Sequence, residues 1–218
     1  MNGKWGFFPA AALLVAAFSS AVAADLTVHA TAPPTNLSAA VSEILEQDAH
    51  QIRVEGEVEA TFWFRRDPPE AESASSQLGV NFSKLSNGDL LGVVEFQVEW
   101  LDYKANRVSP GVYTLRYQVQ PADGNHMGVS QFRDFFVLVP AELDEDPEAR
   151  YSYAELMALS TQASGVTHPA TMALFPVYEE VSEPKLFQDD LGQWTLARAF
   201  DSTVIGVVVT GTGKTDGF

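Results

Sequence analysis

The chain has 218 residues, and its 29 Asp and Glu against 13 Lys and Arg give a formal net charge of −16. Such a charge repels phosphate backbones and anionic lipid surfaces, so it argues against nucleic acid and membrane surfaces as partners. The sequence contains no Cys. A disulfide-stapled small domain is therefore excluded, and stability must come from a packed core.

The first residues have the pattern of a secretory signal peptide. Lys4 supplies a positive charge, residues 7–18 form an apolar run, and Ala21-Val22-Ala23 provides the small side chains that a signal peptidase prefers. No Cys follows the apolar run, so lipid attachment is not expected. We expect residues 1–24 to be removed by cleavage after Ala23 or Ala24.

The rest of the chain has the features of an exported domain. No second apolar stretch is long enough to span a membrane. Residues 25–218 are enough for one generous domain, and no long linker divides them. We therefore expect a single soluble domain that is periplasmic or secreted.

The first half of this domain changes from a helical to a strand pattern. Apolar residues from Leu37 to Leu45 are spaced three and four apart, which predicts an amphipathic helix over residues 38–47. Residues 58–64 and 94–100 then alternate between apolar and polar side chains, which predicts strands with one buried face. Asn87-Gly88 is a turn signal between these strands.

The middle of the chain predicts a hairpin with a long polar loop. Tyr113 to Val119 alternate with polar residues, so we expect a strand with one dry and one wet face that ends at Pro121. Residues 135–139 are apolar at every position, as in a strand covered on both faces. A long loop held between two strands is a usual place for binding residues.

The last part of the chain contains a second predicted helix and three predicted strands. The acidic run 142–148 is expected to be a solvated connector. Ser152 and Glu155 form a capping box for a helix over residues 153–163 that Gly165 ends. Three strands are predicted further on, and Asp189 to Gly192 is a tight turn before the second of them; the strands cover residues 172–178, 193–200 and 204–210.

These elements predict a mainly β fold. About eight short strands with turn signals and two short helices favour an antiparallel β-sandwich, either immunoglobulin-like or jelly-roll.

One loop concentrates the potential ligands. Asp123, His126 and Met127 lie in the hairpin loop, and His168 lies in a second loop. Imidazole suits copper and zinc, and a thioether adds a preference for Cu(I), so these four residues are the candidate metal site. The alternative is a structural loop in which Asp-Gly-Asn is a turn and His126 bonds to the loop backbone.

The same stretch resembles a known family. The segment from Pro110-Gly111 to Val119, the Asp123 to His126 loop and the Phe-rich strand after it resemble the end of CopC-type periplasmic copper-resistance proteins. The resemblance implies an immunoglobulin-like sandwich, with Cu(II) bound by Asp123 and His126. The family uses a third His at its mature N-terminus. Here His29 follows the predicted cleavage site by several residues, and one extra residue separates Asp123 from His126.

A wider pattern is similar to a group of exported bacterial β-rich proteins of unassigned activity. It combines the loop, Arg133-Asp134, the acidic connector and the SGVTHPA segment that contains His168. This similarity implies an exported β-rich domain and no particular chemistry.

Other functions have weaker support from the sequence. Trp63, Trp100 and Trp194 could stack on sugars, with Trp63 the best placed because it falls on the polar face of its strand. Nucleophile, zinc-protease and phosphate-loop motifs are absent, so an enzyme is not favoured. We expect a non-catalytic binding domain for a small ligand or an envelope protein; the alternatives are a periplasmic copper or other metal-binding protein and a carbohydrate-binding module.

Overall fold

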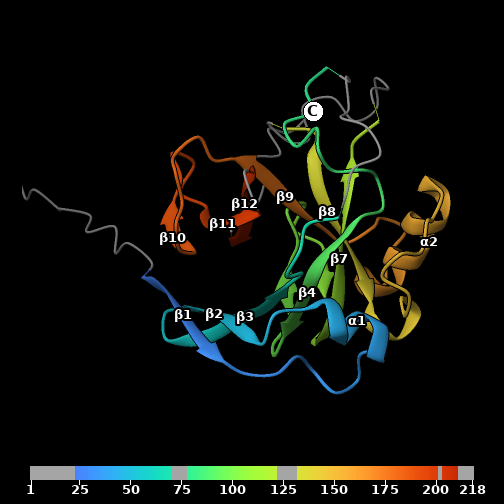
Figure 1. Ribbon diagram of the computed structural model, residues 1–218, viewed down its shortest axis with the longest axis horizontal. Coiled ribbons are helices and arrows are strands. Elements are labelled where there is room, and N and C mark those ends of the chain that lie inside the picture. The colour runs from blue at the N-terminus through green and yellow to red at the C-terminus, as the bar shows by residue number, and fades with distance from the viewer. Residues whose placement is uncertain (1–22, 70–77, 122–131, 201–202, 211–218) are drawn as a thin grey trace, which may run out of the picture.

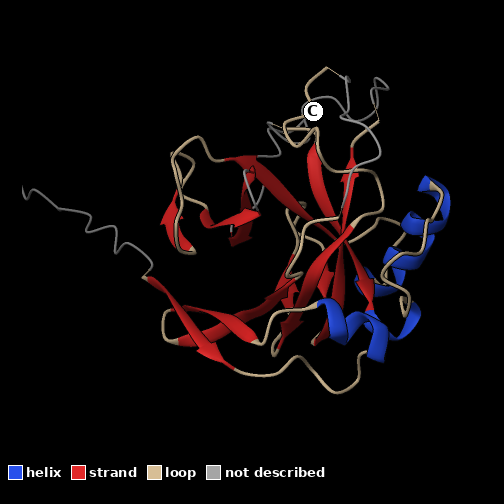
Figure 2. Cartoon of the chain, in the orientation of Figure 1, coloured by secondary structure: helices blue, strands red, loops and turns tan. Residues whose placement is uncertain are grey.

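The computed structural model describes residues 23–69, 78–121, 132–200 and 203–210. Figure 1 shows the chain from its N-terminal to its C-terminal end, and Figure 2 shows that strands dominate, with the helices gathered on one side. The strands are β1 (Ala24–Ala30), β2 (Asp48–Val54), β3 (Glu57–Phe64), β4 (Leu90–Phe96), β5 (Trp100–Leu101), β6 (Arg107–Val108), β7 (Gly111–Val119), β8 (Asp134–Pro140), β9 (Thr171–Pro176), β10 (Lys185–Gln188), β11 (Trp194–Phe200) and β12 (Thr203–Thr210). The helices are α1 (Ala39–Ile44), the 3-10 turn η1 (Ala141–Leu143) and α2 (Tyr153–Ser164).

Ten of these strands form one antiparallel sheet that curves back on itself. Their order is β1-β2-β3-β4-β7-β8-β9-β12-β11-β10, while β5 and β6 form a separate ribbon. Strand β9 connects the two halves of the curved sheet. Its first residues, Thr171 to Ala173, pair with β8, and its last residues, Leu174 to Pro176, pair with β12. The two edge strands, β1 and β10, approach within 8 Å between Cα atoms. The predicted mainly β, antiparallel fold with two short α-helices is confirmed.

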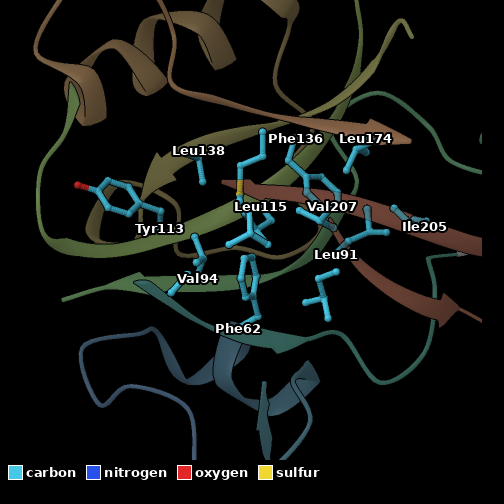
Figure 3. Close-up of a cluster of buried hydrophobic side chains, with 14 of the residues drawn as sticks. Phe62, Leu91, Val94, Tyr113, Leu115, Phe136, Leu138, Leu174, Ile205 and Val207 are labelled. Atoms are coloured by element: carbon cyan, nitrogen blue, oxygen red, sulfur yellow. The ribbon is translucent and has the colours of Figure 1, made fainter. Parts of the chain in front are cut away.

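The concave face of this sheet encloses the main core. Figure 3 shows side chains from β3, β4, β7, β8, β9 and β12 pointing into one interior. The rings of Phe64 on β3 and Phe200 on β11 meet edge to face, with centroids 5.7 Å apart. Trp100 also reaches across, because its indole N–H donates to the Val209 carbonyl at 2.8 Å. Strands far apart in the sheet order therefore share one core.

Three smaller clusters cover the convex face. Under α1, Val41 and Leu45 pack with Trp63 and Val93. The other two clusters lie further along the sheet. Under α2, Leu156 packs on Val137 and Val139 of β8. Over β9 and β12, the β5–β6 loop and residue 132 close the face with a cluster of Tyr103, Phe132, Ala173, Phe175 and Val208.

Both predicted helices are confirmed, α1 over a shorter range than the predicted 38–47, and the predicted capping box of α2 is present. Ser38 caps α1 by accepting from the Val41 N–H at 3.1 Å. At α2 the capping box is complete, since the Glu155 N–H donates to Ser152 Oγ and the Ser152 N–H donates to the Glu155 carboxylate. Gly165 ends α2 at φ +65°, a left-handed conformation that glycine adopts without strain.

The prediction of a solvent-exposed face is wrong for β7 and for the second half of β3. Thr61 and Trp63 on β3 are buried, as are Thr114, Arg116 and Gln118 on β7. The alternation itself is present, because Tyr113, Leu115 and Tyr117 lie in the main core. The opposite face is dry because the α1 segment covers β3 and the acidic connector covers β7, and strand periodicity contains no information on either contact.

Two boundaries also differ from the prediction. The strand predicted over residues 94–100 is divided, since β4 ends at Phe96 and Trp100 begins β5. The connector 142–148 is not wholly solvated, because its residue Asp144 is buried. The segments 24–30, 48–51 and 185–188 form strands that the sequence patterns did not predict, two of them at the edges of the sheet.

Candidate functional site

Three of the four predicted metal ligands lie outside the described residues. These are Asp123, Met127 and His126, so their grouping with His168 stays a prediction. His168 is exposed after the end of α2, and its carbonyl accepts from Ser164 Oγ at 2.6 Å. Within the described part of the chain, no three His, Asp or Glu side chains gather in a group that could hold a metal ion.

The two ends of the loop that contains Asp123 and His126 are fixed to the sheet. The Gln120 N–H donates to the Arg133 carbonyl at 2.8 Å, and the Arg133 guanidinium donates to the Gln120 and Leu78 carbonyls. Next to Arg133, the buried Asp134 carboxylate accepts from the Tyr117 hydroxyl at 2.6 Å and from the Asn81 side-chain amide at 2.8 Å. Gln120 and Phe132 therefore hold defined positions at the start and end of this loop.

A small cavity lies beside these two residues on the convex face of the sheet. We call it the α2 pocket; it lies over β8 and β9, between α2 and the β5–β6 loop, and its volume is about 120 Å³. It is lined by Tyr103, Lys104, Gln120, Phe132, Phe135, Tyr153, Met157, His168, Pro169, Thr171 and Ala173. His168 thus lines the same pocket as the residues that flank the predicted metal-binding loop.

The floor and one wall of the α2 pocket follow from strand and helix geometry. Phe135 of β8 and Ala173 of β9 are opposite each other in the antiparallel register, and Thr171 is two residues before Ala173 on the same face. Tyr153 and Met157 are four residues apart on α2, so they share one side of the helix. Buried Ser160 fixes the helix against the sheet, because its hydroxyl bonds to both the N–H and the carbonyl of Ala170.

The other wall is a tight loop organised by a buried carboxylate. Asp102 accepts from the Lys104 N–H at 2.9 Å, from the Asn106 N–H at 2.7 Å and from the Asn106 side chain at 3.1 Å. Burial raises the pKa of Asp102, although these hydrogen bonds oppose the shift. The Tyr103 N–H donates to the Thr171 carbonyl at 3.4 Å. This loop therefore holds Tyr103 and Lys104 against the start of β9.

The chemistry of the α2 pocket is that of a binding site for a small apolar group. Its lining is mainly aromatic and aliphatic, and its polar groups are the side chains of Lys104, Gln120, His168 and Thr171 together with the hydroxyls of Tyr103 and Tyr153. Sites for drug-sized ligands are about 300–1,000 Å³. A protein cavity of about 150 Å³ holds benzene. The α2 pocket is therefore of a size for one ring or one side chain, and not for an oligosaccharide.

Of the residues that line this pocket, only His168 was a candidate ligand predicted from the sequence. Some signal for the others was present, since Tyr153 and Met157 have helical spacing, and Phe135 alternates with the core residue Phe136. No local pattern indicates that Tyr103 and Lys104 meet them, because that contact depends on β5 and β6 folding over β9.

The predicted sugar-stacking residues are mostly buried. Trp63 and Trp100 are each 3% exposed. A wider hollow of about 460 Å³ lies between residues 31–36 and the outer face of β3. Trp63 lines it, but its indole N–H donates to the Thr31 carbonyl at 2.9 Å and its ring is covered. The prediction that Trp63 offers a ring to solvent is wrong, because the segment before α1 crosses the polar face of β3.

Comparison of the chain with models of protein families, with curated proteins and with solved structures gave no match. None of the described helices is both long enough and apolar enough to cross a bilayer.

Proposed function

We propose that this chain is an exported, non-catalytic binding protein whose α2 pocket takes a small ligand. The observation that carries the proposal is the aromatic lining of that pocket, which is built by two structural elements that are each fixed to the sheet. The loop organised by Asp102 is attached to β9 through the Tyr103 N–H, and α2 is attached to the sheet through Ser160. The capping box orders the first turn of α2. A pocket with prepared walls loses little conformational entropy when a ligand binds, which favours affinity.

Ligand-observed NMR with benzyl alcohol, a neutral single-ring probe, tests this proposal on the purified protein. We expect binding that is lost in Ala173→Leu, which fills the pocket from its floor. Since Ala173 is 3% exposed, added bulk could also disturb folding. Met157→Trp therefore serves as a second pocket-filling variant from the partly exposed face of α2.

Ala158→Trp is the matched control, because Ala158 is the next residue of α2 and is exposed, away from the pocket. Binding should be unchanged in this variant. The proposal is wrong if benzyl alcohol does not bind the unmodified protein, or if binding persists in both filled variants while each remains folded by circular dichroism.

We propose a copper site as a second candidate function, and one observation favours it. His168 lies in the same pocket as Gln120 and Phe132, the described residues on either side of the loop that contains Asp123, His126 and Met127. Titration of Cu(I), Cu(II) and Zn(II) into the protein and into His126→Ala and His168→Ala tests this site. We expect both substitutions to weaken copper binding. Affinity unchanged by either substitution contradicts the assignment.

A further inference from the structure

We infer that the ligand of the α2 pocket is a single-ring aromatic carboxylate, with its ring among the apolar side chains and its carboxylate toward Lys104 and His168. This inference rests on the proposed function, because it assigns a ligand class to the same pocket. It adds two requirements, one on the size of the apolar part and one on the charge of the polar part.

The size of the pocket selects the ring. At about 120 Å³ the cavity is slightly smaller than the roughly 150 Å³ cavity that binds benzene. The rings of Phe132, Phe135 and Tyr153 line it, and Met157 adds a thioether. Aromatic rings and methionine sulfur both make favourable contacts with another aromatic ring, in addition to the effect of the buried area. A flat six-membered ring fits these walls better than a branched or fused group.

The charge of the lining selects the anion. The chain has more than twice as many acidic as basic residues, yet the described residues that line the α2 pocket include Lys104 and His168 and no Asp or Glu. An ammonium group offers three donors and no acceptor, so it pairs with an acceptor-only group such as a carboxylate. His168 can donate a further hydrogen bond from its ring.

The positions of Lys104 and His168 agree with this orientation. Lys104 and His168 are both exposed, whereas Phe135 and Thr171 are only partly exposed and Ala173 is buried. A ligand with its ring against the sheet therefore has its polar end at the rim, where the Lys104 ammonium and the His168 ring lie. Because these side chains are exposed, solvent weakens the charge interaction, and we expect a preference of roughly tenfold for the anion and not more.

The test compares four probes by ligand-observed NMR titration: benzoate, benzyl alcohol, benzylamine and acetate. We expect benzoate to bind roughly tenfold more tightly than benzyl alcohol, with benzylamine weaker than both and acetate not detectably bound. In Lys104→Gln, the dissociation constant for benzoate should rise toward that of benzyl alcohol, while the value for benzyl alcohol stays the same. Lys185→Gln is the control, since it removes the same charge from β10, away from the pocket.

Each outcome separates this inference from the proposed function. Equal affinity for benzoate and benzyl alcohol rejects the anion requirement and leaves the proposed function standing. Acetate binding as tightly as benzoate rejects the ring requirement. A preference for benzoate that persists unchanged in both Lys104→Gln and His168→Gln rejects the assignment of Lys104 and His168 as the groups that hold the carboxylate. Failure of every ring probe to bind rejects the proposed function itself.

Discussion

Arg116 is the one charged residue of β7, and its side chain is completely buried. Its guanidinium makes five hydrogen bonds, two of them to the Asp144 carboxylate at 2.7 Å each and three to main-chain carbonyls at 2.6 to 3.1 Å. Asp144 also accepts from the hydroxyls of Thr114 and Tyr151. Burial and then the charge of Asp144 raise the pKa of Tyr151 to about 12, so its hydroxyl remains a donor at neutral pH. This network attaches the acidic connector to the sheet.

Removing the carboxylate from this network should strongly destabilise the protein. Asp144→Ala leaves the Arg116 guanidinium buried without a counter-charge, and we expect the free energy of unfolding to fall by about 3–5 kcal/mol. Urea unfolding followed by tryptophan fluorescence measures the change. Glu142→Ala is the control, because Glu142 belongs to the same acidic run but is exposed, and it should change stability by less than about 0.5 kcal/mol. Similar effects of the two substitutions would contradict the structural role of Asp144.

At the scale of elements, a polar cluster joins the two ends of the curved sheet. Glu46, between α1 and β2, is hydrogen-bonded to His50 of β2 at 3.4 Å and forms an ion pair with Arg198 of β11. The Arg198 guanidinium also lies over the rings of Phe64 and Phe200, at 5.0 and 5.1 Å from their centroids. Strands β2 and β11 are second from opposite edges of the sheet, so this cluster helps to hold the curve closed.

The Glu46 cluster predicts a loss of stability in acid. Burial raises the pKa of Glu46, but the His50 hydrogen bond and the Arg198 charge outweigh it, so the pKa lies below its ordinary value of 4.5. A carboxylate with a lowered folded-state pKa stabilises the fold above about pH 4.5, and this contribution disappears as the pH falls through the folded-state pKa. Glu46→Gln should therefore be less stable than the natural chain at pH 6, and the difference should shrink below pH 4.5.

Denaturant unfolding of both proteins at several pH values measures this difference. Comparing the two proteins is necessary because other carboxylates shift the opposite way: burial raises the pKa values of Glu59, Asp89 and Asp102. Those groups are common to both proteins, so their contributions cancel in the difference. A stability difference that stays constant from pH 6 to pH 3 would show that Glu46 contributes nothing through its charge.

At the scale of the whole molecule, the sheet order predicts the order of hydrogen exchange. Strands β7 and β8 lie in the middle of the sheet and are covered on both faces, whereas β1 and β10 have one unpaired edge each in the described structure. Amide groups in edge strands open locally at low cost, and those in central strands open only when most of the fold opens. Exchange measured by NMR should therefore be slowest in β7 and β8, and protection of β1 equal to that of β7 would contradict the topology.

The export signal is tested on the chain as a whole. When the full sequence is expressed in a bacterial host with a secretion pathway, we expect the protein in the periplasm or the medium, beginning at Ala24 or Asp25. N-terminal sequencing of the purified protein measures the cleavage point. Recovery of uncleaved protein from the cytoplasm would contradict the prediction of a signal peptide.

Features encoded by neighbouring residues were predictable from the sequence. The α2 helix was predicted with its cap because Ser152, Glu155 and Gly165 act on the backbone within a few residues. The core side of β7 was predicted because alternation places Tyr113, Leu115 and Tyr117 on one face. Edge strands β1 and β10 were missed, since their alternation is weak where little of either strand is buried.

The candidate site was predictable only in part, because most of its residues are brought together by contacts between distant segments. His168 was identified from its residue type, but the pocket that it lines also needs Lys104 from the β5–β6 loop and Met157 from α2. His168 and Met157 come together because β9 pairs with β8, a contact between strands more than thirty positions apart. Lys104 joins them because the β5–β6 loop folds against the start of β9.

The sequence by itself thus determined the fold class, the two helices, the caps of α2, and the inward face of the main strands. Only the tertiary structure decided which polar face became dry and where a pocket formed. A local pattern states that a side chain needs burial or a hydrogen-bond partner. It does not state which distant segment provides that burial or that partner. Arg116 has a polar position on its strand, yet the acidic connector covers it completely and supplies Asp144 as its partner.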